Sequence, residues 1–239
     1  MLRVKIIEKL IHINENLIFY PRLKRYYKNN ISSIKPIIFD IGSNKGQTID
    51  FFLKIYKNCT IYGFEPNQRL YLLLLEKYKY NSNIKLFNCG ISAENGKLLF
   101  RETVMDESST FEELNYNSKY LETKSKVLGV KKENIIKSSY DVDVINLNDF
   151  ISSEALDRID IIKIDTEGHE YKCLRGLFKS KLNSLIVFIQ LEHHEDDMYL
   201  NNTSKDLIED ILKINNYQMH KKIKHGFGNF DEMIYKYSG

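Results

Sequence analysis

The feature that most constrains the fold is the apolar run Ile37–Ile41, which leads through a glycine-containing loop into a helical pattern. A second apolar run, Thr60–Phe64, follows that helix and ends directly before Glu65. The order of strand, helix and strand predicts a parallel βαβ unit, because parallel neighbours need a long crossover connection. Ligands of such units bind beyond the carboxyl ends of the strands.

The loop after the first strand, DIGSNKG at residues 40–46, is suited to a nucleotide-like ligand. Gly42 allows a sharp turn because glycine tolerates positive φ, and Gly46 lets the next helix approach the ligand closely. The first N–H groups of that helix can hold an anion. Glu65 is placed to accept hydrogen bonds from both hydroxyls of a ribose. We therefore predict that the ligand is held by these two turns, through Asp40, Gly42, Ser43, Asn44, Gly46, Glu65 and Pro66.

The spacing of the two glycines discriminates among ligands. A dinucleotide fingerprint reads G-x-G-x-x-G, whereas this loop holds two glycines four residues apart. The spacing therefore argues against a nicotinamide-dependent oxidoreductase. That class stays open as an alternative, as does a nucleotide-binding module that has lost catalytic activity.

A second block, IDIIKIDTEGHEYKCLRGLF at residues 159–178, is a strand that ends in Asp165 and turns through Thr166-Glu167-Gly168 into an amphipathic helix. The series DIGSNKG, FEPN, KIDTEGHE and LRGLF, from about Pro36 to about Glu192, resembles the FkbM family of methyltransferases. The resemblance implies a class I methyltransferase fold with S-adenosylmethionine as cofactor. It also implies O-methylation of a hydroxyl on a sugar, a glycan or a related small molecule, as in polysaccharide modification.

The alternation of strands and helices predicts a doubly wound, mostly parallel α/β sheet. The resemblance implies seven strands in a Rossmann-like order, with an antiparallel hairpin at the C-terminus. We expect a helical extension over residues 1–34, a methyltransferase domain over 35–239, and a polar, helix-poor insertion loop over 106–139. The remaining strands are expected at Asn83–Cys89, Lys97–Val104, Tyr140–Ile145, Leu185–Leu191, Tyr217–Ile223 and Glu232–Tyr237.

The N-terminal helix should carry one apolar face, because Ile6, Leu10, Ile13 and Leu17 recur at helical spacing. We expect this face to pack against the domain and the basic run after Pro21 to form a solvated turn. Contact of this segment with an anionic acceptor or a membrane surface is the alternative.

Other predicted site residues follow from the strand ends and from the resemblance. Asn88, Cys89, Gly90 and Asp165 lie at the carboxyl ends of predicted strands and are assigned to the cofactor. Contacts to the acceptor are assigned to Glu167 and Glu192, and the resemblance suggests that Ser109 also approaches the active site.

Methyl transfer to a hydroxyl benefits from a general base, because a protonated hydroxyl is a poor nucleophile. Asp165, His169, His193 and His194 are candidates. Adjacent strand residues point to opposite sides, so at most one of the two neighbouring histidines faces the site. We select Asp165 and His193, and expect His169 to have a capping role.

Asp165, Glu192 and His193 also have the chemistry to bind Mg²⁺. Nothing in the spacing defines a set of three ligands, so we expect no metal.

Bulk properties limit the partners. A net charge of +3 is too small to indicate nucleic-acid binding. No apolar stretch reaches the roughly 18 residues of a transmembrane helix. Cys59, Cys89 and Cys173 are well separated and predict reduced thiols in a cytoplasmic protein. The expected partner is a small-molecule or glycan acceptor, and no motif specifies an oligomeric state.

Overall fold

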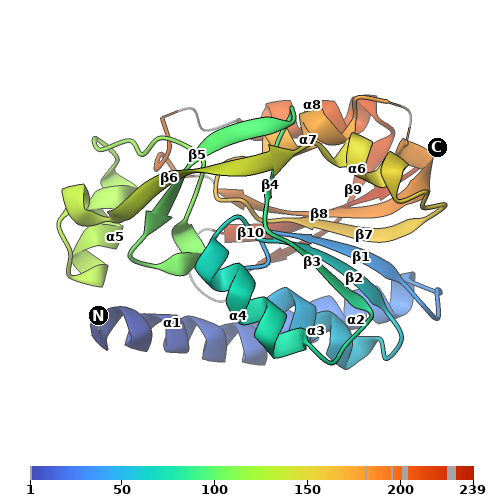
Figure 1. The fold of residues 1–239 in the computed structure, drawn as a ribbon, viewed down its shortest axis with the longest axis horizontal. Helices are drawn as coiled ribbons and strands as arrows, with labels where there is room; N and C mark the ends of the chain where they lie inside the picture. The colour runs from blue at the N-terminus through green and yellow to red at the C-terminus, as the bar shows by residue number, and fades with distance from the viewer. Residues whose placement is uncertain (1, 181, 195, 201–203, 225–229) are drawn as a thin grey trace.

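The computed structural model of the chain describes residues 2–180, 182–194, 196–200, 204–224 and 230–239. Its centre is a seven-stranded sheet with the strand order β3-β2-β1-β7-β8-β10-β9 (Figure 1). The strands of this sheet are β1 (Ile37–Ile41), β2 (Thr60–Phe64), β3 (Ile84–Phe87), β7 (Ile159–Ile164), β8 (Ile186–His194), β9 (Tyr217–Lys224) and β10 (Phe230–Tyr237). Strand β10 is antiparallel to both of its neighbours, and the other pairs are parallel. The predicted mostly parallel sheet with a C-terminal hairpin is confirmed.

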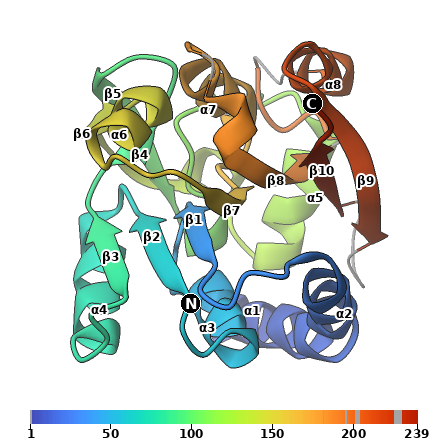
Figure 2. The same ribbon diagram turned by 90° about the vertical axis from the view of Figure 1, so that its right-hand side faces the viewer.

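Helices cover both faces of the sheet, as Figure 2 shows. One face packs against α2 (Tyr20–Asn30), α3 (Gln47–Ile55) and α4 (Gln68–Tyr78). The other packs against α6 (Leu147–Ser153), α7 (Glu170–Leu177) and α8 (Lys205–Ile214). All residues of the central strand β7 are buried, as expected of a strand covered on both sides.

The chain reverses its direction of travel across the sheet between β1 and β7. From β1 it moves outward through β2 and β3, and it later returns to β7 on the other side of β1. Loops that leave β1 and β7 therefore diverge, and a crevice forms beyond the carboxyl ends of these strands.

A second, three-stranded sheet lies beside α6 and α7. It contains β4 (Gly90–Ile91), β5 (Gly96–Thr103) and β6 (Ile136–Ile145) in the order β4-β6-β5. Strands β5 and β6 are antiparallel, although the segment with η2 and α5 separates them in the sequence. The observed β6 begins four residues earlier than predicted.

The expectation of a helix-poor loop over 106–139 is wrong. This segment holds a helix, α5 (Lys119–Leu128), and two short 3₁₀ turns, η2 (Asp106–Ser108) and η3 (Lys132–Asn134). The hydroxyl of Ser118 caps α5 by accepting from the backbone of Leu121 at 2.9 Å. Leu121 and Leu128 are buried, so a few apolar residues suffice to dock a mostly polar helix.

The N-terminal segment is helical as predicted, but a different face of the helix from the predicted one packs on the domain. The helices α1 (Leu2–Asn14) and α2 are joined by a π-helical turn, η1 (Glu15–Phe19), with helical backbone angles throughout. The predicted face, Ile6, Leu10, Ile13 and Leu17, is exposed, whereas the other side of the helix is turned inward. Inward-facing residues are Val4, Ile7, Ile11, Phe19, Leu23 and Tyr27.

Two further predictions are wrong: the conformation of the basic run after Pro21 and the end of β8. The basic run after Pro21 is helical and not a turn, because proline is tolerated in the first turn of α2. Strand β8 continues through His194, three residues beyond the predicted end, because β10 pairs with it over that length. Among the helices of the described residues, none has both the length and the apolar character needed to cross a bilayer.

Candidate active site

A cavity of about 420 Å³ lies beyond the carboxyl ends of β1, β2, β7 and β8. Its walls come from the loops after these strands, from the N-terminal helix and from the segment that contains η2 and α5. Most of the predicted site residues line it: Gly42, Ser43, Asn44, Glu65, Pro66, Cys89, Gly90, Ser109, Asp165, Glu167 and Glu192. Residues from six separate segments of the sequence thus meet at one cavity.

The loop after β1 requires glycine at its first turn. Gly42 has φ of +84°, and its N–H donates to the carbonyl of Phe64 at 3.0 Å. A Cβ added here would lie 2.0 Å from the backbone oxygen of Asp165. The loop after β1 and the end of β7 therefore contact one another directly, and only a residue without a side chain allows that approach.

Glu65 lies on the wall of this cavity and is only 4% exposed. One carboxylate oxygen accepts from the N–H of Asn44 at 2.7 Å, and the other accepts from the N–H of Asn67 at 2.8 Å. Each oxygen keeps capacity for a second hydrogen bond. The carboxylate is therefore held rigidly against the glycine loop with acceptor capacity left for a ligand.

Asn44 supports the same interpretation. Its side-chain Oδ1 is buried at the cavity wall and accepts no hydrogen bond from the described residues. Buried polar atoms are usually hydrogen-bonded, so this oxygen is suited to a donor on a ligand. The Oδ1 atom of Asn44 and the carboxylate of Glu65 therefore both offer hydrogen-bond acceptors to a ligand in the cavity.

The end of β7 presents an ion pair. Lys163, which is buried, donates from Nζ to Oδ2 of Asp165 at 2.6 Å. Burial by itself lowers the pKa of Lys163, but Asp165, Asp40 and Glu232 together raise it above its ordinary value. The ammonium therefore stays charged and holds one oxygen of Asp165 in place beside the cavity.

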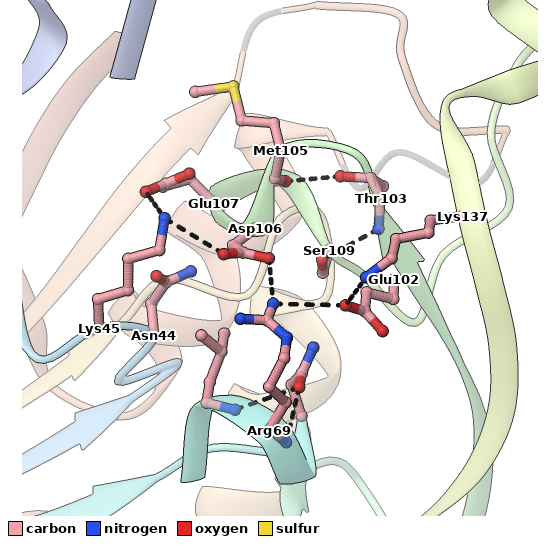
Figure 3. A network of polar contacts seen from close by, with 12 residues as sticks. Asn44, Lys45, Arg69, Glu102, Thr103, Met105, Asp106, Glu107, Ser109 and Lys137 are labelled. Atoms are coloured by element: carbon pink, nitrogen blue, oxygen red, sulfur yellow. Dashed lines mark hydrogen bonds and ion pairs between the residues drawn. The ribbon is translucent and has the colours of Figure 1, made fainter. Parts of the chain in front are cut away.

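An ion-pair network joins the glycine loop and α4 to the segment that contains η2 (Figure 3). Lys45, from the glycine loop, pairs with Asp106 and Glu107 of η2 at 3.2 and 3.1 Å. Arg69, at the start of α4, pairs with Asp106 and Glu102. These contacts join the insertion to the two turns that form the nucleotide-like half of the site.

Comparison with known proteins identifies the family. Residues 40–219 match the family model described as the methyltransferase FkbM domain. The chain belongs to the FkbM methyltransferase family. It is 25% identical over 178 residues to 2-O-methyltransferase NoeI of Sinorhizobium fredii, covering 74% of this chain and 71% of that protein. It is 28% identical over 156 residues to methyltransferase sdnD of Sordaria araneosa, covering 59% and 60% of the two chains.

Solved structures share the fold. A methyltransferase FkbM from Methylobacillus flagellatus superposes with a TM-score of 0.55 and 17% identity, over 87% of this chain and 45% of that chain. The chain thus spans less than half of that protein. A magnesium protoporphyrin IX methyltransferase from Synechocystis, solved with bound S-adenosylmethionine, gives a TM-score of 0.51 at 9% identity, over 92% and 78% of the two chains.

The cofactor of this FkbM methyltransferase is S-adenosylmethionine, and the residues of the cavity fit it. The carboxylate of Glu65 suits the ribose hydroxyls, and the loop from Gly42 to Asn44 suits the amino-acid end. Cys89 and Gly90, which follow β3, also line the cavity and would hold another part of the cofactor. The family match is to a methyltransferase domain and does not support the alternative of a nicotinamide-dependent oxidoreductase.

Three residues that we assigned to the cofactor do not line the cavity: Asp40, Gly46 and Asn88. Asp40 is completely buried at the end of β1, in register with Lys163. Gly46, with φ of +82°, begins α3, and a Cβ there would meet the hydroxyl of Tyr78 at 2.4 Å. Asn88 donates from Nδ2 to the backbone oxygens of Glu65 and Pro66. Asn88 therefore stabilises the turn after β2, and Gly46 allows α4 to pack closely against the start of α3.

Of the candidate general bases, His169 is separated from the cavity. It is 1% exposed, and its ring nitrogens contact the carboxylate of Glu112 at 2.5 Å and the hydroxyl of Ser92 at 3.0 Å. His193 lies within β8 opposite Asp231, and its side chain is outside what the structure describes. Asp165 is therefore the candidate whose carboxylate is placed on the cavity wall.

Glu167, which the sequence predicted, lies on the cavity wall together with residues that the sequence did not indicate. Glu167, with φ of +53°, accepts from the hydroxyl of Tyr199 at 2.7 Å, and its carbonyl accepts from Thr110 at 2.6 Å. The N-terminal helix and α5 add apolar and polar wall residues that lie far from the motifs in sequence: Ile7, Ile11, Phe19, Tyr20, Tyr120, Thr123, Lys124 and Val127. Among the described residues, no three His, Cys, Asp or Glu side chains converge as metal ligands.

Replacing Glu65 with alanine should weaken binding of S-adenosylhomocysteine by about 1.5–3 kcal/mol, because charged hydrogen bonds to the ribose are lost. Calorimetric titration measures the change. Glu76→Ala is the matched control, because Glu76 lies on the exposed side of α4 with a 74% exposed side chain. Equal affinities for the wild type and Glu65→Ala would remove Glu65 from the cofactor site.

The affinity for S-adenosylhomocysteine should also depend on pH, because the carboxylate of Glu65 titrates. Burial raises the pKa of Glu65 to about 7, although the amides of Asn67 and Asn44 oppose the rise. The ionised carboxylate accepts from the ribose, so affinity should be full above pH 7 and fall by up to about tenfold per pH unit below it. Titrations with S-adenosylhomocysteine at several pH values should show this slope for the wild type and lose most of it in Glu65→Gln.

Proposed function

We propose that this FkbM methyltransferase transfers a methyl group to a hydroxyl of a sugar, a glycan or a related small molecule. The observation that carries the proposal is the carboxylate of Asp165, which lies on the cavity wall and is held by Lys163. A carboxylate in this place suits a hydroxyl acceptor, because it can take the proton that the oxygen loses as the new bond forms. The name of the relative NoeI, a 2-O-methyltransferase, supports the same chemistry.

The cofactor, when bound, supplies an electrophilic methyl group on its sulfonium. The chain's own residues then have to position the acceptor, since alignment of the attacking oxygen provides much of the acceleration. Ser109, Glu167 and Glu192 line the acceptor side and offer hydroxyl and carboxylate groups to the other hydroxyls of a sugar. Residues of the N-terminal helix and of α5 also line the cavity, and we propose that they shield the bound acceptor from water.

The partners of the proposal are a small-molecule or glycan acceptor and no nucleic acid. Cys59, Cys89 and Cys173 are buried as free thiols, which fits the reducing cytoplasm that we propose as its location.

Incubation of the full chain with S-adenosylmethionine and a panel of sugars, oligosaccharides and phenolic or amine acceptors tests the proposal. We expect a product heavier by one CH₂ unit on a hydroxyl compound, together with formation of S-adenosylhomocysteine. Methylation of amines or thiols only would overturn the O-methyltransferase assignment. Binding of S-adenosylhomocysteine without turnover on any acceptor would favour the inactive nucleotide-binding module instead.

A further inference from the structure

The outward face of the N-terminal helix is the most unusual surface of the described chain. Ile6, Leu10, Ile13 and Leu17 are 51, 57, 47 and 73% exposed. They are spaced by four, three and four residues, so they form one stripe along the helix. Contiguous exposed apolar side chains mark interaction sites more often than scattered ones do.

The stripe is not the side of the helix that stabilises the fold. The opposite side, which runs from Val4 through Ile11 to Leu23, packs against the domain or lines the cavity. The helix is thus apolar on two sides, and its docking on the domain leaves one of them uncovered in the described part of the chain.

Basic side chains border the stripe and follow it in the sequence. Lys9 is exposed and lies three residues after Ile6 and four before Ile13, so it borders the stripe. Beyond Leu17, the exposed residues of α2 include Arg22, Lys24, Arg25 and Lys28. The exposed side chains of the N-terminal segment thus include an apolar stripe in α1 and a basic cluster in α2.

The charge of the segment differs from that of the rest of the chain. Residues 1–34 contain seven Lys and Arg against two Glu, which gives +5. Residues 35–239 contain the other 28 Lys and Arg against 30 Asp and Glu, which gives −2. A basic segment on an otherwise slightly acidic domain orients the molecule toward an anionic surface.

A shallow groove beside the helix extends this basic surface. Lys24 from α2, Lys45 from the glycine loop, and Lys54 and Lys77 from α3 and α4 line it, with Asp50 as its one acidic residue. Lys45 pairs with Asp106 and Glu107, and Lys77 pairs with Asp50, so Lys24 and Lys54 are the ammonium groups of this groove that suit lipid phosphates beside an embedded helix.

We propose that the outward face of the N-terminal helix binds the surface of an anionic phospholipid membrane. The helix lies parallel to the bilayer, its apolar stripe inserts among the acyl chains next to the head groups, and the basic cluster in α2 contacts lipid phosphates. Because the inward side of the same helix lines the cavity through Ile7 and Ile11, the acceptor opening lies close to the membrane. The proposal does not depend on the chemistry of the acceptor.

Flotation of the full chain with vesicles tests the proposal. We expect the protein to float with vesicles of phosphatidylcholine and phosphatidylglycerol, to float far less with phosphatidylcholine alone, and to be released by high salt. Leu10→Gln/Leu17→Gln should lower the apparent affinity at least about tenfold, and Arg22→Gln/Arg25→Gln should remove the preference for anionic lipid.

The matched control is Leu207→Gln/Ile214→Gln, which removes two exposed apolar side chains from α8. That helix lies on the opposite side of the molecule from α1 (Figures 1 and 2), so vesicle binding should be unchanged. Circular dichroism and the affinity for S-adenosylhomocysteine check that each variant is folded. These readouts stay normal if membrane binding fails, which separates this proposal from the proposed function.

A fluorescence measurement gives a second test. The chain contains no tryptophan, so Leu17→Trp introduces a single reporter on the stripe. We expect its emission to shift to shorter wavelength with anionic vesicles, and that of Ile214→Trp to stay constant. The proposal is overturned if the wild type floats with no vesicle, or if the Leu10/Leu17 double variant floats as well as the wild type. It is also overturned if the wild type is a dimer that this double variant dissociates, because the stripe is then an interface between two copies.

Discussion

Gly42→Ala is expected to lose binding of S-adenosylhomocysteine and to lower the free energy of unfolding by about 2–5 kcal/mol. Two effects add at this position. Alanine is strained at φ of +84°, and its Cβ would lie 2.0 Å from the backbone oxygen of Asp165. A backbone atom cannot rotate away, so the loop after β1 must separate from the end of β7. Thermal unfolding with and without S-adenosylhomocysteine measures both losses.

Gly96→Ala is the matched control for this prediction. Gly96 also has a positive φ, of +158°, but a Cβ there would meet nothing within 4 Å. Gly96→Ala therefore introduces the backbone strain of a positive φ without a steric clash. This variant should bind the cofactor with the affinity of the wild type. If Gly42→Ala binds S-adenosylhomocysteine with wild-type affinity, the loop after β1 does not hold the cofactor in the way described.

Asp165→Asn should reduce kcat by about 10²–10⁴-fold, because an amide cannot accept the proton of the acceptor hydroxyl. Shape and hydrogen-bonding reach are largely kept, so S-adenosylhomocysteine should still bind. Steady-state kinetics on the acceptor found in the panel, together with calorimetry, separate the two effects. A large fall in kcat with little change in cofactor affinity is the expected result.

Asp160→Asn provides the comparison on the same strand. Asp160 is buried at the amino end of β7, where it accepts from the N–H of Ile37 and pairs with Arg158. This substitution should lower stability and leave the kcat of the folded enzyme unchanged. Wild-type kcat in Asp165→Asn would exclude Asp165 as the base and leave His193 as the remaining candidate to test.

Local patterns predicted the centre of the sheet well. The bounds of β1 and β2 agree residue for residue with the prediction, because each is a short apolar run between polar segments and is buried in the structure. The glycine turn and Glu65 were also predictable, since backbone geometry at a βα turn restricts the residue type. These features are local, and the fold does not override them.

The errors arise where a distant partner decides the outcome. Apolar residues lie on two sides of the N-terminal helix, so periodicity could not choose the side that packs on the domain. The length of β8 depends on pairing with β10, which lies about 40 residues away in the sequence. The helix α5 carried a readable signal, a capping Ser118 and Gly129 at its end, but its polar composition outweighed that signal.

The placement of individual side chains was the least predictable part of the site. Asp40 and Asn88 lie near the ends of predicted strands, as Glu65 does, yet Asp40 is buried within the sheet and Asn88 bonds the backbone of the turn after β2. His169 is in the middle of a motif and is held by Glu112, a residue of the insertion 57 positions away. Only the packing of the insertion against α7 determines that this histidine is closed off from the cavity.

A crystal structure of the full chain with S-adenosylhomocysteine tests the central claim most directly. We predict that both ribose hydroxyls donate to the carboxylate of Glu65 within about 3 Å, and that the amino-acid end lies against the loop from Gly42 to Asn44. The sulfur should then face Asp165. A nucleoside bound elsewhere, or one whose ribose makes no contact with Glu65, would contradict the account.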